Sequence, residues 1–228
     1  MRRAGPWAFL DRVLYKCVQL ALRGLFRLWF GFRVEGDVPD DGPLIVAANH
    51  SSFLDALLVG TASRRRLRFL MTDQFRGHPL LRWFGAWSRV IYVREEGLNR
   101  DMFRQALEAL GRGEALGIFP EGAISRDGAL QELQPGILAL AQRRGVPVVP
   151  MGLSGPFAAL PRHRRFPRPA TIRVRIGAPI PAAELFPAGL DRDAALAHGA
   201  RVLEDALRAL GAGAVAATPD GPRPSTPA

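Results

Sequence analysis

The sequence predicts an α/β protein with a mixed, largely parallel sheet flanked by helices, preceded by an N-terminal amphipathic helix that associates with a membrane. Three observations support this prediction. Short segments rich in β-branched and aliphatic residues alternate with segments of helical spacing along most of the 228 residues. The first thirty residues carry one stripe of polar side chains on an otherwise apolar helix. Hydrophobic residues make up 48% of the chain, which excludes a disordered or collagen-like protein.

Residues 1–31 form the predicted N-terminal helix. Its polar residues recur at steps of three or four, which places them on one stripe: Arg12, Lys16, Gln19, Arg23 and Arg27. Crossing a bilayer is unfavourable by a few kcal/mol, because about ten strongly apolar residues at ~−0.5 kcal/mol offset only part of three cations at ~+3 each. The alternative is an ordinary core helix, but such a helix buries a narrower apolar stripe. We therefore expect this helix to lie on a membrane surface.

Residues 32–210 are predicted to form one domain. Strands are expected at 32–35, 44–47, 67–71, 90–93, 115–119, 146–153 and 171–176, and helices at 52–62, 98–110, 137–144 and 191–210. This alternation is typical of a sheet with helices packed against it. Residues 211–228 contain too few large apolar side chains to pack, and we expect them to form a disordered tail.

The formal net charge of +10 indicates an anionic partner, which charge alone leaves open among nucleic acid, an anionic membrane and a phosphorylated substrate. The single cysteine, Cys17, excludes an internal disulfide and is typical of a reducing compartment. Asp11, Arg12 and Lys16 interrupt the N-terminal apolar run, so we expect no signal peptide. His78, His163 and His198 lack the spacing of metal ligands, and we expect no metal.

The first joint between a predicted strand and a predicted helix contains His50 and Asp55. Five helical residues would set these side chains about 140° apart, so they can pair only if His50 precedes the helix. There the helix dipole would keep the ring neutral and available as a base, with Asp55 accepting its other N–H. The alternative is a capping box, Ser52-x-x-Asp55, in which Asp55 caps its own helix. On spacing alone the capping box is the favoured interpretation.

Three later joints carry further candidates. Glu121 stands between Pro120 and Gly122 at the end of a predicted strand, where the bend does not itself require a carboxylate. Arg94 ends another strand, and Pro150 closes a strand that reads as buried.

In chain order, the segments NHSSFLD, GAWSRVIYVR, FPEG and VPVVPMGLSG resemble the four ordered motifs of the glycerolipid acyltransferase family, that of the 1-acylglycerol-3-phosphate acyltransferases. The resemblance runs from about Phe32 to Pro181. It implies that His50 is the general base that deprotonates the hydroxyl of a lysolipid, and that Asp55 orients the ring. The hydroxyl then attacks an acyl thioester directly, which suits a chain without a cysteine motif for a covalent relay.

The resemblance also implies a set of substrate-binding residues. Asn49 opens the first motif, and Arg94 is expected to hold phosphate. Glu121 and Gly122 are expected to help place the polar head of the acceptor, and Pro150 to shape the acyl-binding region. Members that form phosphatidate usually continue FPEG with Thr, Arg and Ser. Here Ala123 and Ile124 replace the first two and only Ser125 agrees, which leaves Arg126 as a substitute contact to the anion.

The resulting expectation is an O-acyltransferase on the cytoplasmic face of the inner membrane. It would transfer a fatty acyl group from acyl-CoA or acyl carrier protein, as co-substrate and without a cofactor, to a lysophospholipid. The expected acceptor is 1-acylglycerol-3-phosphate; the alternatives are lysophosphatidylethanolamine or lyso-ornithine lipid, and a non-catalytic basic protein that binds lipid or nucleic acid. The basic runs at 63–68 and 162–165 lack interleaved aromatic residues and a helix-turn-helix signal. We expect them to be solvated faces, or contacts to headgroups and donor phosphates, and we expect no nucleic-acid partner.

Overall fold

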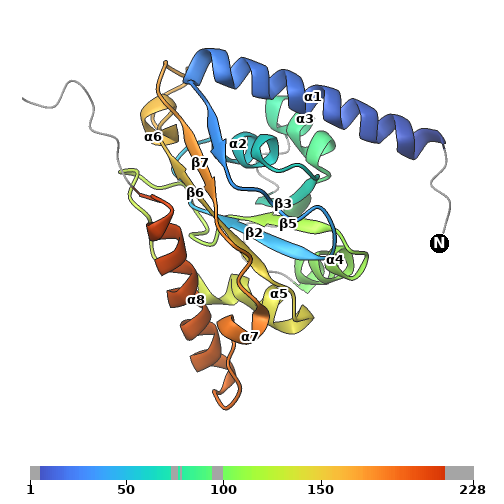
Figure 1. Cartoon of the computed structure of the whole chain (residues 1–228), viewed down its shortest axis with the longest axis vertical. Coiled ribbons are helices and arrows are strands. Elements are labelled where there is room, and N and C mark those ends of the chain that lie inside the picture. The colour runs from blue at the N-terminus through green and yellow to red at the C-terminus, as the bar shows by residue number, and fades with distance from the viewer. Residues whose placement is uncertain (1–5, 73–76, 78, 94–99, 214–228) are drawn as a thin grey trace, which may run out of the picture.

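The computed structural model describes residues 6–72, 77, 79–93 and 100–213 (Figure 1). Its strands are β1 (Arg33–Glu35), β2 (Leu44–Ala48), β3 (Leu67–Thr72), β4 (Ile91–Val93), β5 (Ala115–Ile118), β6 (Val148–Ser154) and β7 (Arg173–Ile176). Its helices are α1 (Pro6–Phe30), α2 (Asp55–Ala62), α3 (Pro79–Ser88), α4 (Arg100–Gly111), α5 (Pro135–Arg144), α6 (Pro156–Ala159), α7 (Ala182–Leu185) and α8 (Arg192–Ala209). The predicted strands are all present, and α3, α6 and α7 are additional to the predicted helices.

The strands form one mixed sheet in the order β1-β7-β6-β2-β5-β3-β4. The run from β6 to β4 is parallel, β7 is antiparallel to β6, and β1 is parallel to β7. The predicted fold class, an α/β fold with a mixed and mostly parallel sheet, is therefore confirmed. The central strand β2 lies between β5 and β6, which places the carboxyl ends of all three strands at one edge.

Helices cover both faces of the sheet, as Figure 1 shows. In β2, Ile45 and Ala47 belong to an apolar cluster with α4, α5 and α8. The alternate residues Val46 and Ala48 belong to a second cluster with α1, α2 and α3. This alternation follows from the two-residue period of a strand whose two faces are both buried.

Helix α1 has a buried face and an exposed apolar face. Tyr15, Phe26 and Phe30 are each only 5% exposed and belong to the cluster formed with α2 and α3. Several large apolar side chains point to solvent instead: Phe9, Leu10, Val13, Leu14, Leu20, Leu25, Leu28 and Trp29. One face of α1 is therefore packed as in a core helix. The other face is apolar and exposed, as expected of a helix that lies on a surface.

One residue of the predicted polar stripe on α1 does not face solvent. Gln19 is buried, and its Nε2 donates to the Gly60 carbonyl of α2 at 2.9 Å. Its place in the 3.6-residue repeat was correct, but that place lies against α2, where the amide finds a backbone partner. No helix in the described part of the chain is both long and apolar enough to cross a membrane.

Candidate active site

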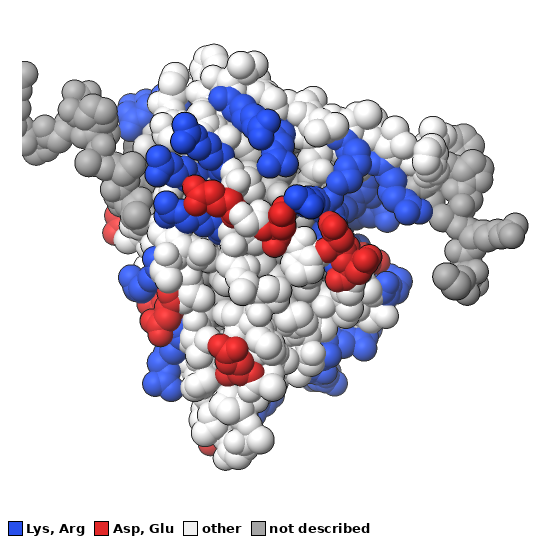
Figure 2. All heavy atoms as spheres, in the orientation of Figure 1, with Lys and Arg blue, Asp and Glu red and all other residues white. Residues whose placement is uncertain are grey.

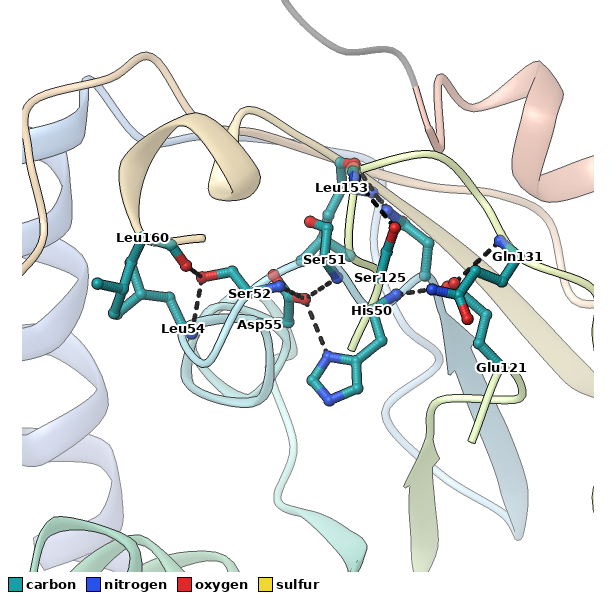
Figure 3. Close-up of polar contacts among 12 residues, drawn as sticks. His50, Ser51, Ser52, Leu54, Asp55, Glu121, Ser125, Gln131, Leu153 and Leu160 are labelled. Atoms are coloured by element: carbon teal, nitrogen blue, oxygen red, sulfur yellow. Dashed lines mark hydrogen bonds and ion pairs between the residues drawn. The ribbon is translucent and has the colours of Figure 1, made fainter. Parts of the chain in front are cut away.

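The site is built where β2 ends at the centre of the sheet. His50 follows β2 and precedes α2, which begins at Asp55. The chain turns between them and brings His50 Nδ1 to 3.0 Å from Asp55 Oδ2 (Figure 3). This is the arrangement that pairing required: the histidine lies outside the helix and the aspartate begins it.

Asp55 also holds the turn that precedes its own helix. Its Oδ2 accepts hydrogen bonds from the backbone N–H groups of Ser51 at 2.6 Å and Ser52 at 2.7 Å, and the residue is fully buried. The capping box is only half formed, because the Ser52 hydroxyl accepts from Leu54 N and donates to the Leu160 carbonyl. The same carboxylate oxygen, Asp55 Oδ2, therefore both pairs with the His50 ring and accepts the backbone N–H of Ser52.

The imidazole of His50 is oriented by contacts on two sides. With Asp55 as acceptor, Nδ1 carries the proton and Nε2 has a free lone pair. The ring stacks on Phe119, with centroids 4.1 Å apart and an interplanar angle of 17°. The side chain is 19% exposed, and Nε2 has no hydrogen-bond partner among the described residues. These contacts leave one basic nitrogen open to a substrate.

Glu121 supports the backbone of His50. It comes from the turn after β5, is 5% exposed, and its Oε1 accepts from His50 N at 2.6 Å while Oε2 accepts from Gln131 N at 3.0 Å. Burial raises the pKa of Glu121 to about 7, against the opposing effect of the two N–H donors. Because both oxygens are occupied, Glu121 acts here as a support for His50.

Of the other predicted site residues that the structure describes, three are buried beside His50 and two lie at the surface. The Asn49 amide is buried and pairs with the Leu153 backbone in both directions, at 3.0 and 2.7 Å. Ser125 is buried, and its N donates to the His50 carbonyl at 2.8 Å. Pro150 is buried in β6 opposite Ala47. These three residues hold the site together from within.

Gly122 and Arg126 lie at the surface. Gly122 has a φ of 76°, and an added Cβ would lie 2.3 Å from Gln134 Nε2, so only glycine fits this turn. Arg94 lies outside the described residues.

A pocket of about 480 Å³ opens beside this turn, lined by Ala123, Ile124, Arg126, Asp127, Gln131 and Arg162. Its wall is joined to His50 through Ser125, which follows Ile124, and through Gln131, whose N–H binds Glu121. Hydrogen bonds from Ala129 N and the Ser125 hydroxyl lower the pKa of Asp127. The pocket therefore holds charges of both signs.

Sequence reasoning missed Phe119 and Gln131. Arg162 belongs to the conspicuous basic run Arg162–Arg165, which was expected to be solvated or to contact headgroups and donor phosphates, and it lines the pocket. Phe119 and Gln131 gave no such signal, because one acts by stacking and the other through its backbone N–H. Within the described ranges, no group of three His, Cys, Asp or Glu side chains is placed to hold a metal.

Comparison with known proteins identifies relatives of this arrangement. A family model described as Acyltransferase matches residues 31–154. The lyso-ornithine lipid O-acyltransferase of Pseudomonas aeruginosa is 32% identical over 126 residues, which are 55% of this chain and 48% of that protein. The 1-acyl-sn-glycerol-3-phosphate acyltransferase of Saccharomyces cerevisiae is 31% identical over 149 residues, 60% of this chain and 47% of that protein.

The fold has a counterpart among solved structures. The crystal structure of the 1-acyl-sn-glycerophosphate (LPA) acyltransferase PlsC from Thermotoga maritima matches with a TM-score of 0.74, covering 93% of this chain and 85% of that one. At 23% identity this match supports the fold alone. The chain spans about half or less of the first curated relatives it matches, with shares of 48%, 36% and 34% of their lengths.

Proposed function

This chain belongs to the Acyltransferase family, and from that premise we propose that it transfers a fatty acyl group from an acyl thioester to the free hydroxyl of a lysophospholipid. The observation that carries the proposal is the His50–Asp55 pair, joined at 3.0 Å, with His50 Nε2 open. A protein that only binds lipid does not need a base and a carboxylate that orients it.

The reaction follows from the geometry of this pair. His50 Nε2 takes the proton of the acceptor hydroxyl as its oxygen attacks the thioester carbonyl carbon. Asp55 Oδ2 stabilises the imidazolium that forms, because it already accepts the Nδ1 proton. When the tetrahedral intermediate collapses, the carbon–sulfur bond breaks and the imidazolium returns its proton to the leaving thiolate. The products are the diacylated lipid and a free thiol, with no covalent enzyme intermediate.

The test is His50→Ala. We expect it to lower kcat by roughly 10²-fold to 10⁴-fold, the usual contribution of a positioned base. The measurement is transfer of labelled acyl groups from acyl-CoA and from acyl carrier protein, which also identifies the donor. His198→Ala is the control. This histidine lies on α8, and its Nδ1 is 3.2 Å from the Leu185 carbonyl, so the variant also removes an imidazole but leaves the His50–Asp55 pair intact. Full transfer by His50→Ala would refute the mechanism, and no transfer by the unaltered protein would favour the non-catalytic binding protein.

The place of reaction is proposed to be the cytoplasmic face of the inner membrane. The exposed apolar face of α1 supports this, because lysolipid acceptors reside in a bilayer while the thioester donors are soluble. In this arrangement α1 lies on the headgroups and the acceptor enters the site from the lipid side.

The proposed acceptor is 1-acylglycerol-3-phosphate, which would yield phosphatidic acid. Several curated relatives of this chain are named 1-acyl-sn-glycerol-3-phosphate acyltransferase. Arg126 and Arg162 in the pocket supply guanidinium groups for a phosphate, in place of the arginine that Ile124 replaces.

A second acceptor class is favoured by Asp127. A carboxylate beside two arginines suits a headgroup that carries both an anion and an ammonium, as lysophosphatidylethanolamine and lyso-ornithine lipid do, better than a phosphate monoester. The relative from Pseudomonas aeruginosa is named for lyso-ornithine lipid. Both acceptor classes would use the same base, and the pocket would distinguish them by the charges of their polar groups.

Asp127→Asn separates the two candidates, because its amide oxygen can still accept from Ala129 N while the charge is removed. If the acceptor is zwitterionic, kcat/KM for it falls by about threefold, because its ammonium loses a solvent-exposed carboxylate partner. For lysophosphatidate, kcat/KM stays level or rises. The measurement is a comparison of the acceptors with both proteins, and Asp193→Asn, on the remote helix α8, is the control.

A further inference from the structure

A basic loop projects from the domain between α6 and β7, formed by Pro161–Arg168. Residues 162–167 are all exposed, and Phe166 is 81% exposed. The loop carries four arginines and a histidine around this phenylalanine: Arg162, His163, Arg164, Arg165 and Arg168. No Asp or Glu occurs in the sequence between Glu132 and Glu184. An exposed aromatic side chain is thus surrounded by cations.

The base of this loop is fixed. Arg168 N donates to the Ala159 carbonyl at 2.9 Å, which closes the loop, and Arg164 N donates to the Pro161 carbonyl at 3.0 Å within it. The adjoining Leu160 carbonyl accepts from the Ser52 hydroxyl, two residues after His50. The loop is therefore closed at its base and is anchored beside the site.

The exposed cations of the loop have no anionic partner in the described part of the chain. Some exposed arginines elsewhere are paired, such as Arg64 with Asp37, Arg104 with Glu108 and Arg208 with Glu204, while others, such as Arg143 and Arg201, make no ion pair with a described residue. In the loop, Arg162, Arg164 and Arg165 make no ion pair with any described residue. Their charge remains available to an anion from outside the chain.

The loop also adjoins the end of α1. Ile172, four residues after the loop, donates its N–H to the Phe30 carbonyl at the last residue of α1. The neighbouring residues Leu28 and Trp29 of α1 are 89% and 50% exposed. In Figure 2 the upper edge formed by α1 is white, and blue side chains gather at the upper left, over α6 and the upper end of β7.

We propose that the 161–168 loop is a second membrane contact, which binds anionic phospholipid headgroups through Arg164 and Arg165 and inserts Phe166 among the acyl chains. Cations next to an exposed aromatic residue match a bilayer, in which an anionic layer covers an apolar one. Phosphate of a soluble donor or of nucleic acid accounts for the cations but not for an extended apolar edge beside them. Together with α1, the loop would give the domain a second point of contact with the bilayer.

The first test measures binding of the full chain to phosphatidylcholine vesicles with and without phosphatidylglycerol. Arg164→Gln/Arg165→Gln is expected to weaken binding to the anionic vesicles by roughly 30-fold, at about fivefold per arginine, and to leave binding to neutral vesicles unchanged. The matched control is Arg104→Gln/Arg208→Gln, which removes two paired arginines from α4 and α8 and is expected to bind as the unaltered protein does. Equal binding by the loop variant and this control would overturn the proposal.

The second test places a fluorescent reporter on the loop. Phe166→Cys in a Cys17→Ser chain, labelled with an environment-sensitive dye, is expected to shift its emission to the blue on anionic vesicles. Ala183→Cys, exposed on α7 at the far end of the molecule in Figure 1, is expected to show no shift. An unshifted dye at position 166 would overturn the insertion of this residue.

Two further outcomes separate this proposal from acyl transfer. The loop variant is expected to keep full activity on a short-chain, water-soluble lysolipid without vesicles, and loss of that activity would assign the loop to the active site instead. Binding of short RNA or DNA that depends on Arg164 and Arg165, without binding to anionic vesicles, would assign it to nucleic acid. A failure of acyl transfer itself would leave the vesicle measurements intact.

Discussion

At the scale of single residues, the site depends on how the chain holds His50. Its peptide N–H donates to Glu121, its carbonyl accepts from Ser125 N, and its ring is hydrogen-bonded to Asp55. If His50 is the base, as proposed, this fixed backbone leaves its side chain few ways to move, so the open Nε2 keeps one direction. Burial raises the pKa of Glu121 to about 7, which makes this support sensitive to pH.

Glu121→Gln tests this sensitivity. Because the pKa of Glu121 rises from 4.5 to about 7 on folding, the folded state retains its proton over this range, and stability falls as pH rises from 4.5 toward 7. Relative to Glu121→Gln, the unaltered protein should therefore lose up to about 3 kcal/mol of unfolding free energy between about pH 4.5 and pH 8.

Urea unfolding at a series of pH values measures this difference. Glu184→Gln, which removes an exposed carboxylate on α7, is the control. A Glu121→Gln difference that does not change with pH would mean that burial does not govern this carboxyl group.

At the scale of elements, α1 combines two roles on opposite faces. Its buried face contributes Tyr15, which stacks on Trp87 at 4.9 Å, and Asp11 on its flank pairs with Arg66 and Arg89 at 2.8 and 2.7 Å. Its open face presents Leu14 and Leu28 to solvent, 65% and 89% exposed. Since one face belongs to the core, a deletion of the whole helix would test stability and membrane binding together, and substitutions must separate them.

Leu14→Ser/Leu28→Ser should weaken vesicle binding by at least roughly a hundredfold, because each leucine is worth about 2 kcal/mol in apolar surroundings. The melting temperature should stay unchanged, since both side chains are already in water. Phe26→Ala on the buried face should instead lower the unfolding free energy by about 3–5 kcal/mol. Flotation with vesicles and thermal unfolding, applied to both variants, measure the two effects. A drop in melting temperature for the leucine variant would contradict the assignment of faces.

At the scale of the whole molecule, the sequence predicted what local patterns encode. The strands were found because β-branched and aliphatic runs bounded by Gly and Pro are local signals, and α8 because its apolar residues recur over five turns. Helices α6 and α7 are too short to show a period, since each has four residues. In α3, aromatic residues and Gly85 obscure the helical pattern of Pro79–Ser88.

The candidate site was predictable only in part, for the same reason. His50 and Asp55 are close in sequence, so their pairing could be stated as a geometric condition. The partners of Glu121 are backbone N–H groups, which every residue except proline carries, and no residue type marks them. The contact of Asn49 with Leu153 spans 104 residues, and a single sequence holds no record of such a distance.

The order of strands in the sheet also determines when the His50 site can form during synthesis of the chain. β2, which leads to His50, is made early, yet both of its neighbours, β5 and β6, are made late. A ribosome-bound chain that ends before Leu160 lacks the carbonyl that accepts from Ser52, and one that ends before β6 leaves β2 with an unpaired edge. Helix α1 emerges long before either. Helix α1 is therefore made before the sheet can fold, and the His50 site can form only after β5, β6 and Leu160 have been translated.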